Sequence, residues 1–274
     1  TLSEKRAYLS ARQPATLAAI SRVLREVPGE VTELLDLGAG PGTGLLAARE
    51  IFPSIRRAVL VERDREMVAL GKEMVQGFNP EWVIGDLSRV ELPLSDLGLM
   101  AYVLNELEDP APILERAFQA CRILVLIEPG TPAGFERILR AREQLIALGG
   151  SVLAPCPHNR ACPMKAPDWC HFAARVSRTR EHRRAKGADL GFEDEKFSYV
   201  IVEKGGSLRG ISRILARPQL LKGHLKLKLC TEEGLKEEVV TKGAGPLYRR
   251  ARKSKWGDLF SKDVIEDREQ ESEE

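Results

Sequence analysis

The chain lacks the features of membrane-spanning and secreted proteins. No apolar run reaches the roughly 18 residues that a membrane helix needs. The first twenty residues lack the compact apolar segment and small-residue cleavage site of a secretory signal. Cysteine is scarce, with five in 274 residues, and an odd number without a signal indicates a reducing compartment. We therefore expect a cytoplasmic protein without a membrane partner, or a mitochondrial matrix protein if a leader preceded Thr1.

Charge, by contrast, is abundant and unevenly distributed. Residues 1–150 hold 17 basic and 21 acidic side chains, whereas residues 151–260 hold 23 and 12. Residues 261–274 hold 2 and 7, so the three stretches carry about −4, +11 and −5. A basic stretch behind an acidic one favours a polyanionic partner such as RNA. A solvated charged surface is the alternative.

Strands and helices are predicted to alternate through the first 150 residues. Apolar periodicity gives helices at 1–27, 43–51, 64–76, 109–121 and 132–148, and strands within 31–42, 56–63, 81–87, 97–107 and 122–130. Strands that alternate with helices of this length predict an α/β fold, a doubly wound, Rossmann-like parallel sheet.

The pattern changes after Gly150. We expect an irregular loop at 151–172, a very basic helix at 173–186, a strand at 196–205 and an antiparallel hairpin at 223–243. The predicted organisation is a helical segment (1–30), a cofactor-binding core (31–150), a Cys-rich basic insertion (151–195), a return strand (196–210), a hairpin with a basic extension (211–260) and an acidic disordered tail (261–274).

A glycine-rich turn, Asp36-Leu37-Gly38-Ala39-Gly40-Pro41-Gly42, stands where the first predicted strand meets a helix. Glycine lets the backbone bend tightly and leaves room for a ligand. The dinucleotide pattern G-x-G-x-x-G is not met, because its third glycine would fall on Thr43 or Leu45, and no Gly-Lys-Ser/Thr follows. The turn instead resembles motif I of class I S-adenosylmethionine-dependent methyltransferases. A turn that only joins strand to helix is the alternative.

The methyltransferase resemblance extends to the later strand ends. By position, Glu62 would accept hydrogen bonds from the ribose hydroxyls and Asp86 from the adenine amine. The hydroxyls and the amine are donors, and each needs an acceptor. The resemblance implies a cofactor-binding set of Asp36, Gly38, Ala39, Gly40, Gly42, Glu62, Asp86, Leu87 and Tyr102.

Catalytic residues are harder to find. Enzymes that methylate amines of nucleic acids resemble one another in Asp/Asn-Pro-Pro-aromatic at the end of the fourth strand, where this chain has Asn105-Glu106-Leu107. Asn105 is therefore a weak candidate, since the prolines and the aromatic are missing. Cys121 begins the fifth strand, at the end opposite the ligand crevice, and is expected in the core. We predict cofactor binding and leave methyl transfer open.

Three of the five cysteines gather in a proline-rich loop. Cys156, Cys162 and Cys170 are spaced C-x5-C-x7-C, and Cys230 follows at the end of a predicted strand. Zinc ribbons usually open with C-x2–4-C, so the spacing is a poor match to them. Four thiolates could hold an iron–sulfur cluster, with His158 and His171 as alternative ligands.

Several stretches of the second half identify a family. Residues 152–164, 168–172, 178–200 and 249–260, behind a methyltransferase-like first half, resemble the methyltransferase-like assembly factors of the mitochondrial small ribosomal subunit and their bacterial relatives. The resemblance implies S-adenosylmethionine binding, a 4Fe–4S cluster and docking on small-subunit ribosomal RNA in the pre-ribosomal small subunit. The implied cluster ligands are Cys156, Cys162, Cys170 and Cys230. The alternative is a zinc-stabilised methyltransferase acting on a protein or small molecule.

Basic side chains concentrate in two places and are the predicted RNA contacts, because arginine binds phosphate bidentately. They are Arg175, Arg178, Arg180, Arg183, Arg184 and Lys186, and then Arg249, Arg250, Arg252, Lys253 and Lys255. Tyr248 and Trp256 flank the second group and could stack on bases. A solubilising surface is the alternative. We expect the free protein to be a monomer.

Overall fold

A computed structural model describes residues 2–177, 191–208 and 210–262. The chain forms two compact units, Thr1–Pro155 with Asn159–Leu208, and Cys156–His158 with Arg209–Glu274. Among the described residues, no helix has the length and apolarity needed to cross a membrane. Arg178, Arg180, Arg183, Arg184, Lys186 and almost all of the predicted tail lie outside the described residues.

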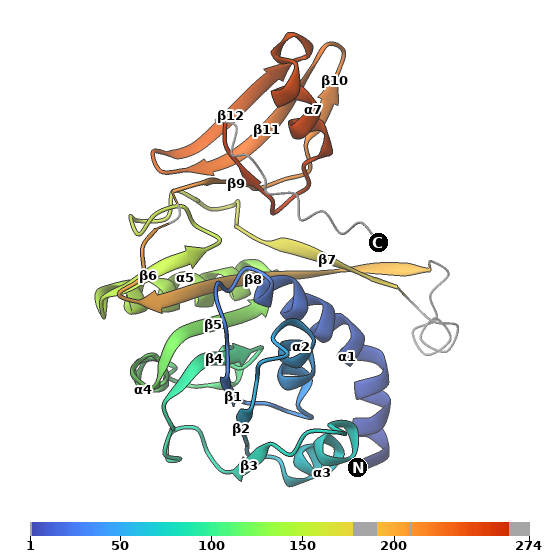
Figure 1. Cartoon of the computed structure of the whole chain (residues 1–274), viewed down its shortest axis with the longest axis vertical. Helices are drawn as coiled ribbons and strands as arrows, with labels where there is room; N and C mark the ends of the chain where they lie inside the picture. Colours follow the sequence, from blue (N-terminus) through green and yellow to red (C-terminus); the bar gives the residue numbers. More distant parts are fainter. Residues whose placement is uncertain (1, 178–190, 209, 263–274) are drawn as a thin grey trace. The chain divides into compact units, whose positions relative to one another are not determined.

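The first unit is a mixed sheet with helices on both faces (Figure 1). Its strands are β1 (Glu33–Leu37), β2 (Arg57–Glu62), β3 (Glu81–Ile84), β4 (Ser95–Ala101), β5 (Cys121–Pro129), β6 (Gly150–Ala154), β7 (Phe172–Ser177) and β8 (Phe192–Lys204). Its helices are α1 (Leu2–Leu24), α2 (Thr43–Ile51), α3 (Arg65–Met74), α4 (Ala111–Ala120) and α5 (Pro132–Ala147), with a short 3-10 turn, η1 (Leu104–Glu106).

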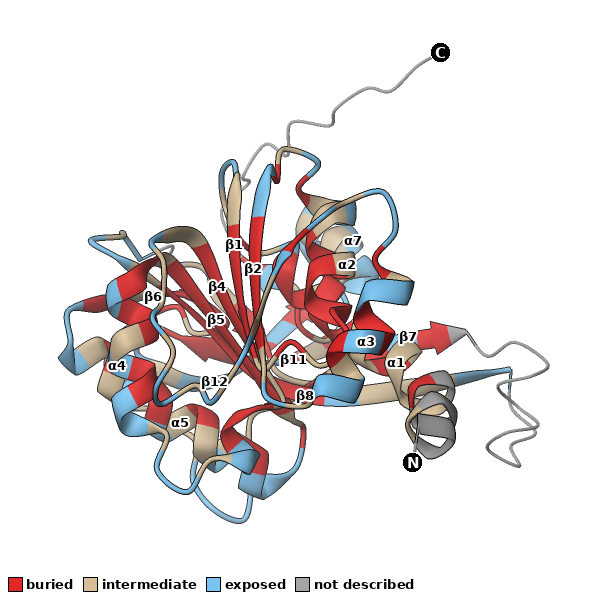
Figure 2. Cartoon of the chain, turned by 90° about the horizontal axis from the view of Figure 1, so that it is seen from below, coloured by how far each residue is buried: buried red, intermediate tan, exposed pale blue. Residues whose placement is uncertain are grey.

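The strand order is β3-β2-β1-β4-β5-β8-β6. The first five strands are parallel, and β8 runs antiparallel to β5. The predicted fold class, an α/β fold with a Rossmann-like sheet, is therefore confirmed. The inner strands β1, β4 and β5 are almost wholly buried, because helices cover both faces (Figure 2).

Three predictions of secondary structure are wrong. β4 ends at Ala101 rather than continuing to residue 107, because Tyr102 adopts a left-handed φ of 63° that turns the chain into η1. Residues 150–154 form β6 instead of opening a loop. Residues 172–177 form β7 instead of a basic helix. In β7 the side chains of Phe172, Ala174 and Val176 are buried in alternation, the period of a strand.

Strands β6 and β7 follow one another along the same edge of β8. β6 pairs with its C-terminal part, and β7 pairs with its N-terminal part up to Phe197. The Cys-rich stretch is the connection between these two edge strands.

The second unit is a small antiparallel sheet. Its strands are β9 (Ser212–Ile214), β10 (Gln219–Leu221), β11 (His224–Thr231), β12 (Gly234–Thr241) and β13 (Leu259–Phe260). A short 3-10 turn, η2 (Lys242–Ala244), and the helix α7 (Pro246–Lys253) connect β12 to β13. The predicted hairpin is confirmed as β11 and β12. Alternate residues of β11 and Ala251 of α7 share a hydrophobic core. Its members are Ile214, Leu225, Leu227, Leu229, Val240, Ala251 and Phe260.

Candidate functional site

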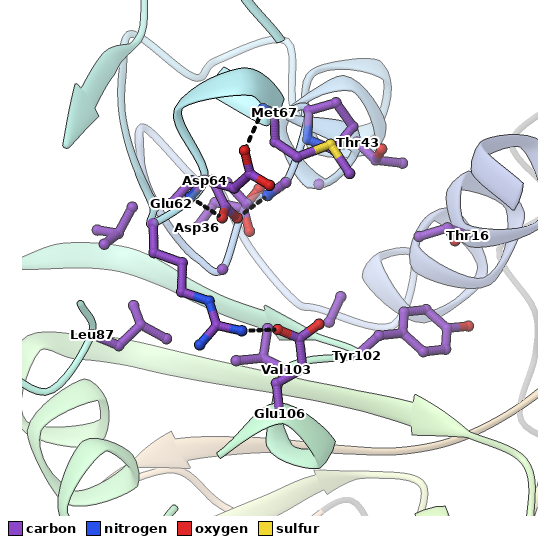
Figure 3. A pocket seen from close by; sticks show the side chains of 18 of the residues that line it. Thr16, Asp36, Thr43, Glu62, Asp64, Met67, Leu87, Tyr102, Val103 and Glu106 are labelled. Atoms are coloured by element: carbon purple, nitrogen blue, oxygen red, sulfur yellow. Dashed lines mark hydrogen bonds and ion pairs between the residues drawn. The ribbon is translucent and has the colours of Figure 1, made fainter. Parts of the chain in front are cut away.

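A pocket of about 460 Å³ lies at the carboxyl ends of the parallel strands of the first unit (Figure 3). Open α/β sheets bind their ligands at this edge. Among its lining residues are the predicted Asp36, Gly38, Ala39, Gly40, Glu62, Asp86, Leu87, Tyr102 and Asn105. Gly42 does not line it. The fold brings together residues that are up to 69 positions apart, and their role in binding stays a prediction.

The backbone of the glycine turn requires glycine. Gly38, Gly40 and Gly42 all have positive φ, at 74°, 55° and 81°. A Cβ on Gly38 would come within 2.5 Å of the Val103 side chain, so this residue also packs against the turn that follows β4. Nothing lies within 4 Å of the position a Cβ would take on Gly40. The turn thus combines tight packing with an open side toward the pocket.

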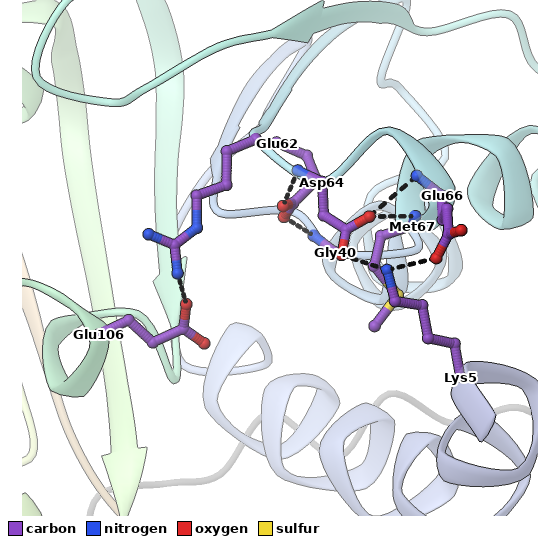
Figure 4. A network of polar contacts seen from close by, with 8 residues as sticks. Lys5, Gly40, Glu62, Asp64, Glu66, Met67 and Glu106 are labelled. Carbon is purple, nitrogen blue, oxygen red and sulfur yellow. Dashed lines mark hydrogen bonds and ion pairs between the residues drawn. The ribbon is translucent and has the colours of Figure 1, made fainter. Parts of the chain in front are cut away.

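Glu62 is fixed in place by backbone donors (Figure 4). Its Oε2 accepts from the N–H of Gly40 at 2.8 Å, and its Oε1 accepts from the N–H of Asp64 at 2.8 Å. Asp64 in turn caps α3 by accepting from the N–H groups of Glu66 and Met67. The carboxylate of Glu62 therefore meets the pocket in a preset orientation.

Asp36 is a buried carboxylate with an unused acceptor. Its side chain is 2% exposed, and Oδ2 has no hydrogen-bond partner. Burial, and secondarily the charge of Glu62, raises the pKa of Asp36 to about 7. Buried polar atoms normally have partners, so an unused acceptor in a pocket wall favours a ligand that brings a donor or a positive charge.

The charged residues lining the pocket are predominantly acidic: Asp36, Glu62, Asp64, Asp86 and Glu106 against Arg12 and Arg63. Arg63 forms an ion pair of 3.1 Å with Glu106, which joins the ends of two strands across the pocket (Figure 3). An acidic cavity attracts cationic ligands and disfavours a phosphate backbone.

Asp86 lies in the loop after β3. Its side chain is exposed, and Oδ1 accepts from the N–H and the hydroxyl of Ser88 at 2.8 and 2.7 Å. The hydrogen bond from the Ser88 N–H, and after it the one from the hydroxyl, lower the pKa of Asp86, so this carboxylate stays ionised. Arg116 of α4 donates to the carbonyl oxygens of Leu87 and Val90 and holds this loop against the sheet.

The turn after β4 closes the other end of the pocket. Buried Glu128 accepts from the N–H of Leu104 at 2.9 Å, and burial raises the pKa of Glu128 to about 7. The hydroxyl of Tyr102 lies 3.5 Å from Oε1 of Glu195, and its pKa is raised, chiefly by burial. Asn105 is exposed and lines the pocket, but none of these contacts makes it a base.

The cysteines divide between the two units. Cys162 and Cys170 belong to the first unit, and Cys156 and Cys230 to the second. None of them forms a disulfide. Within the described ranges, no group of three or more His, Cys, Asp or Glu side chains is arranged to hold a metal ion. As predicted, Cys121 is fully buried in the core, and burial raises the pKa of its thiol to about 12.

Polar contacts hold the part of the Cys-rich loop that belongs to the first unit. Arg142 of α5 donates to the carbonyl of Arg160 at 2.9 Å. The indole N–H of Trp169 donates to the carbonyl of Gly130 at 3.0 Å, and Ser198 donates to the carbonyl of Cys170 at 2.9 Å. Cys162 and Cys170 are thus carried by backbone tied to α5, β5 and β8.

The described basic residues differ in availability. Arg175 is on β7, where it donates twice to Asp194 and stacks over the Phe192 ring at 4.1 Å. Arg250 is half-buried and donates to the carbonyl of Ser261. Four cations remain exposed on or beside α7, namely Arg249, Arg252, Lys253 and Lys255. These four, which we call the α7 cations, are the best described candidates for phosphate contacts.

Sequence reasoning missed part of the pocket. Arg63 and Glu106 are direct neighbours of predicted site residues, so proximity in the chain could have indicated them. Arg12, Gln13 and Thr16 come from α1, and no motif marks them. Their place depends on how α1 packs against the sheet.

Comparison with known proteins gives one family. The family model described as mitochondrial small ribosomal subunit Rsm22 matches residues 2–261. The human ribosome assembly protein METTL17, mitochondrial, is 30% identical over 290 residues, covering 92% of this chain and 61% of that protein. The Schizosaccharomyces pombe Rsm22-cox11 tandem protein 2, mitochondrial, is 26% identical and covers 93% and 42%. The chain thus spans less than two thirds of these relatives. A SAM dependent methyltransferase from Aquifex aeolicus overlaps with 23% identity and a TM-score of 0.44, covering 56% of this chain and 89% of that one.

Proposed function

Because this chain belongs to the mitochondrial small ribosomal subunit Rsm22 family, we propose that it acts in the assembly of a small ribosomal subunit. The observation that carries the proposal is the family match over residues 2–261. The relatives' names place those proteins in mitochondria, which supports a mitochondrial location over the cytoplasmic one first expected.

The pocket is proposed to bind S-adenosylmethionine, which when bound supplies a methyl group on a positively charged sulfur. Three features fit this ligand: the glycine turn open at Gly40, the fixed carboxylate of Glu62 and the buried unused acceptor of Asp36. Glu62 would accept from the ribose hydroxyls, Asp86 from the adenine amine and Asp36 from an ammonium group. The acidic lining suits a ligand with a net positive charge.

Transfer of the methyl group to ribosomal RNA is a separate proposal. The acidic pocket disfavours entry of a phosphate backbone, so an RNA base would have to enter alone. The polar residues near the acceptor end are Asn105 and Tyr102, and the raised pKa of Tyr102 keeps it protonated. We therefore propose that the pocket binds its ligand during assembly, and we favour this role over catalysis.

The proposed partner is small-subunit ribosomal RNA, contacted by the α7 cations and by the basic residues outside the described part. The proposed metal group is a 4Fe–4S cluster on Cys156, Cys162, Cys170 and Cys230. Four thiols without disulfides are the donor set that such clusters use, which supports the proposal chemically.

Calorimetric titration with S-adenosylmethionine and S-adenosylhomocysteine tests the pocket. Glu62→Gln should weaken binding about tenfold or more, because a charged acceptor for ribose is lost. Exposed Glu91, outside the pocket, provides the matched control Glu91→Gln, which should bind as wild type does. Equal affinity of both variants would exclude this pocket as the binding site.

Metal analysis and methyl transfer complete the test. Iron content after anaerobic purification should fall in Cys162→Ser and stay unchanged in Cys121→Ser, whose thiol is in the core. Zinc in place of iron would favour the zinc-stabilised alternative. Radiolabelled methyl incorporation into precursor small-subunit RNA would establish catalysis, and its absence with binding retained would leave the assembly role alone.

A further inference from the structure

The helix α1 differs between its two halves, which meet at Pro14. After Pro14, the helix is anchored in the core: Ala15, Ala19, Ile20, Val23 and Leu24 are at most 2% exposed. Before Pro14, the described side chains are half-buried apart from Leu9, and Lys5, Arg12 and Gln13 reach their neighbours through polar groups.

The first half of α1 covers the pocket. Leu9, Arg12 and Gln13 are among the lining residues, and Thr16 lies just past the proline. Figure 3 shows the part of α1 that carries Thr16 at one side of the pocket. A ligand in the pocket would therefore lie under this part of the helix.

Ion pairs hold this half against two different elements. Lys5 pairs with Asp64 and with Glu66 of α3, the second at 2.8 Å (Figure 4). Arg12 pairs with Glu195 of β8 at 2.9 Å. The Lys5, Asp64 and Glu66 side chains are 26 to 54% exposed, so water and salt compete for the Lys5 pairs and each contributes little. Arg12 donates to both oxygens of Glu195, which is 13% exposed, so this pair is the stronger closing contact.

Pro14 separates the two halves mechanically. Proline has no N–H, so the backbone bond to the carbonyl four residues earlier is absent, and its ring disfavours a straight helix. A helix that is anchored in the core on one side of a proline and held by a few ion pairs on the other can bend at the proline when those pairs open.

We propose that residues 2–13 form a lid over the pocket, hinged at Pro14 and closed by the Lys5 and Arg12 ion pairs. The lid opens to admit the ligand and closes to retain it. The identity of the ligand rests on the proposed function, whereas the motion of the lid does not.

Hydrogen exchange of the ligand-free full chain tests the motion. Amides of residues 2–13 should exchange about tenfold or more faster than those of 15–24, because they open locally. The double variant Lys5→Met/Arg12→Gln should raise exchange in the first half only. The control Arg22→Gln removes the Arg22–Glu26 pair beyond the hinge and should leave the first half unchanged. Equal protection of both halves would overturn the lid.

Stopped-flow binding of S-adenosylhomocysteine tests its role. Lys5→Met/Arg12→Gln should raise the dissociation rate about fivefold, because the closed state loses its ion pairs. Pro14→Ala restores the helical bond and should slow association about threefold. Association and dissociation rates that stay unchanged in both variants would show that residues 2–13 are a fixed wall of the pocket rather than a lid. If wild type binds no ligand but its exchange follows the prediction, the cofactor assignment fails and the lid stands.

Discussion

The two units of this protein use charge in opposite ways. The first unit buries carboxylates at a cavity and beside it: Asp36 lines the cavity, Glu128 holds the turn after β4, and burial raises the pKa of both. The second unit keeps most of its charges in water, where the α7 cations surround a single buried helix residue, Ala251. Buried charge is costly unless something binds it, whereas exposed charge is cheap and reaches a large partner. The difference teaches how the two proposals divide between the units: a small ligand for the first and a surface contact for the second.

The largest expected effect concerns Asp36. The folded-state pKa of about 7 lies above the ordinary aspartate value of 3.8, so the folded protein binds this proton more tightly than the unfolded chain does. The free energy of unfolding should therefore fall by on the order of 4 kcal/mol as the pH rises from about 4 to about 7. Asp36→Asn should remove that share and stabilise the ligand-free protein above pH 7, measured by urea unfolding at several pH values.

The control for this prediction is Asp86→Asn. The pKa of Asp86 is lowered, so its contribution to stability is present at neutral pH and is lost as pH falls. The pKa of Glu128 is also about 7, so both variants should keep a part of the dependence of unfolding free energy on pH. An Asp36→Asn protein with the wild-type pH dependence would show that Asp36 is not the buried charge described here.

An intermediate effect concerns the core of the second unit. Leu227 is fully buried on β11, so Leu227→Ala should cost about 2–5 kcal/mol through lost burial and a cavity. Calorimetry should show a destabilised transition for the second unit, while ligand affinity of the first unit stays unchanged. The neighbouring exposed Lys228 gives the control Lys228→Ala, with little change. If ligand affinity fell together with stability, the two units would not be independent.

The smallest effect concerns the α7 cations. Arg249→Gln/Arg252→Gln should weaken binding of a small-subunit RNA fragment several-fold and reduce the salt dependence of log K by about 2. Arg175→Gln should change affinity less, because Asp194 already occupies its guanidinium. Filter binding over a range of salt concentrations measures both. A larger loss in Arg175→Gln would reverse the ranking of the two basic surfaces.

Local patterns in the chain were sufficient for much of the fold. The helix at 43–51 was predicted at its observed bounds, and the β11–β12 hairpin was recognised from alternation. The prediction failed at residues 172–177, where arginine content suggested a helix. Pairing with β8 decides that segment, and strand partners 15 to 25 residues away leave no local signature.

The sequence by itself determined the order of strands and helices up to α5, the glycine turn at the end of β1 and the acids that follow it, because each depends on spacing along the chain. Only the tertiary structure decided that α1 covers the pocket, that Arg63 meets Glu106 across it, and that Glu128 holds the turn after β4. These contacts join residues between 24 and 183 positions apart. Their energy comes from burial and from paired charges, which exist only once the sheet has brought distant strands together.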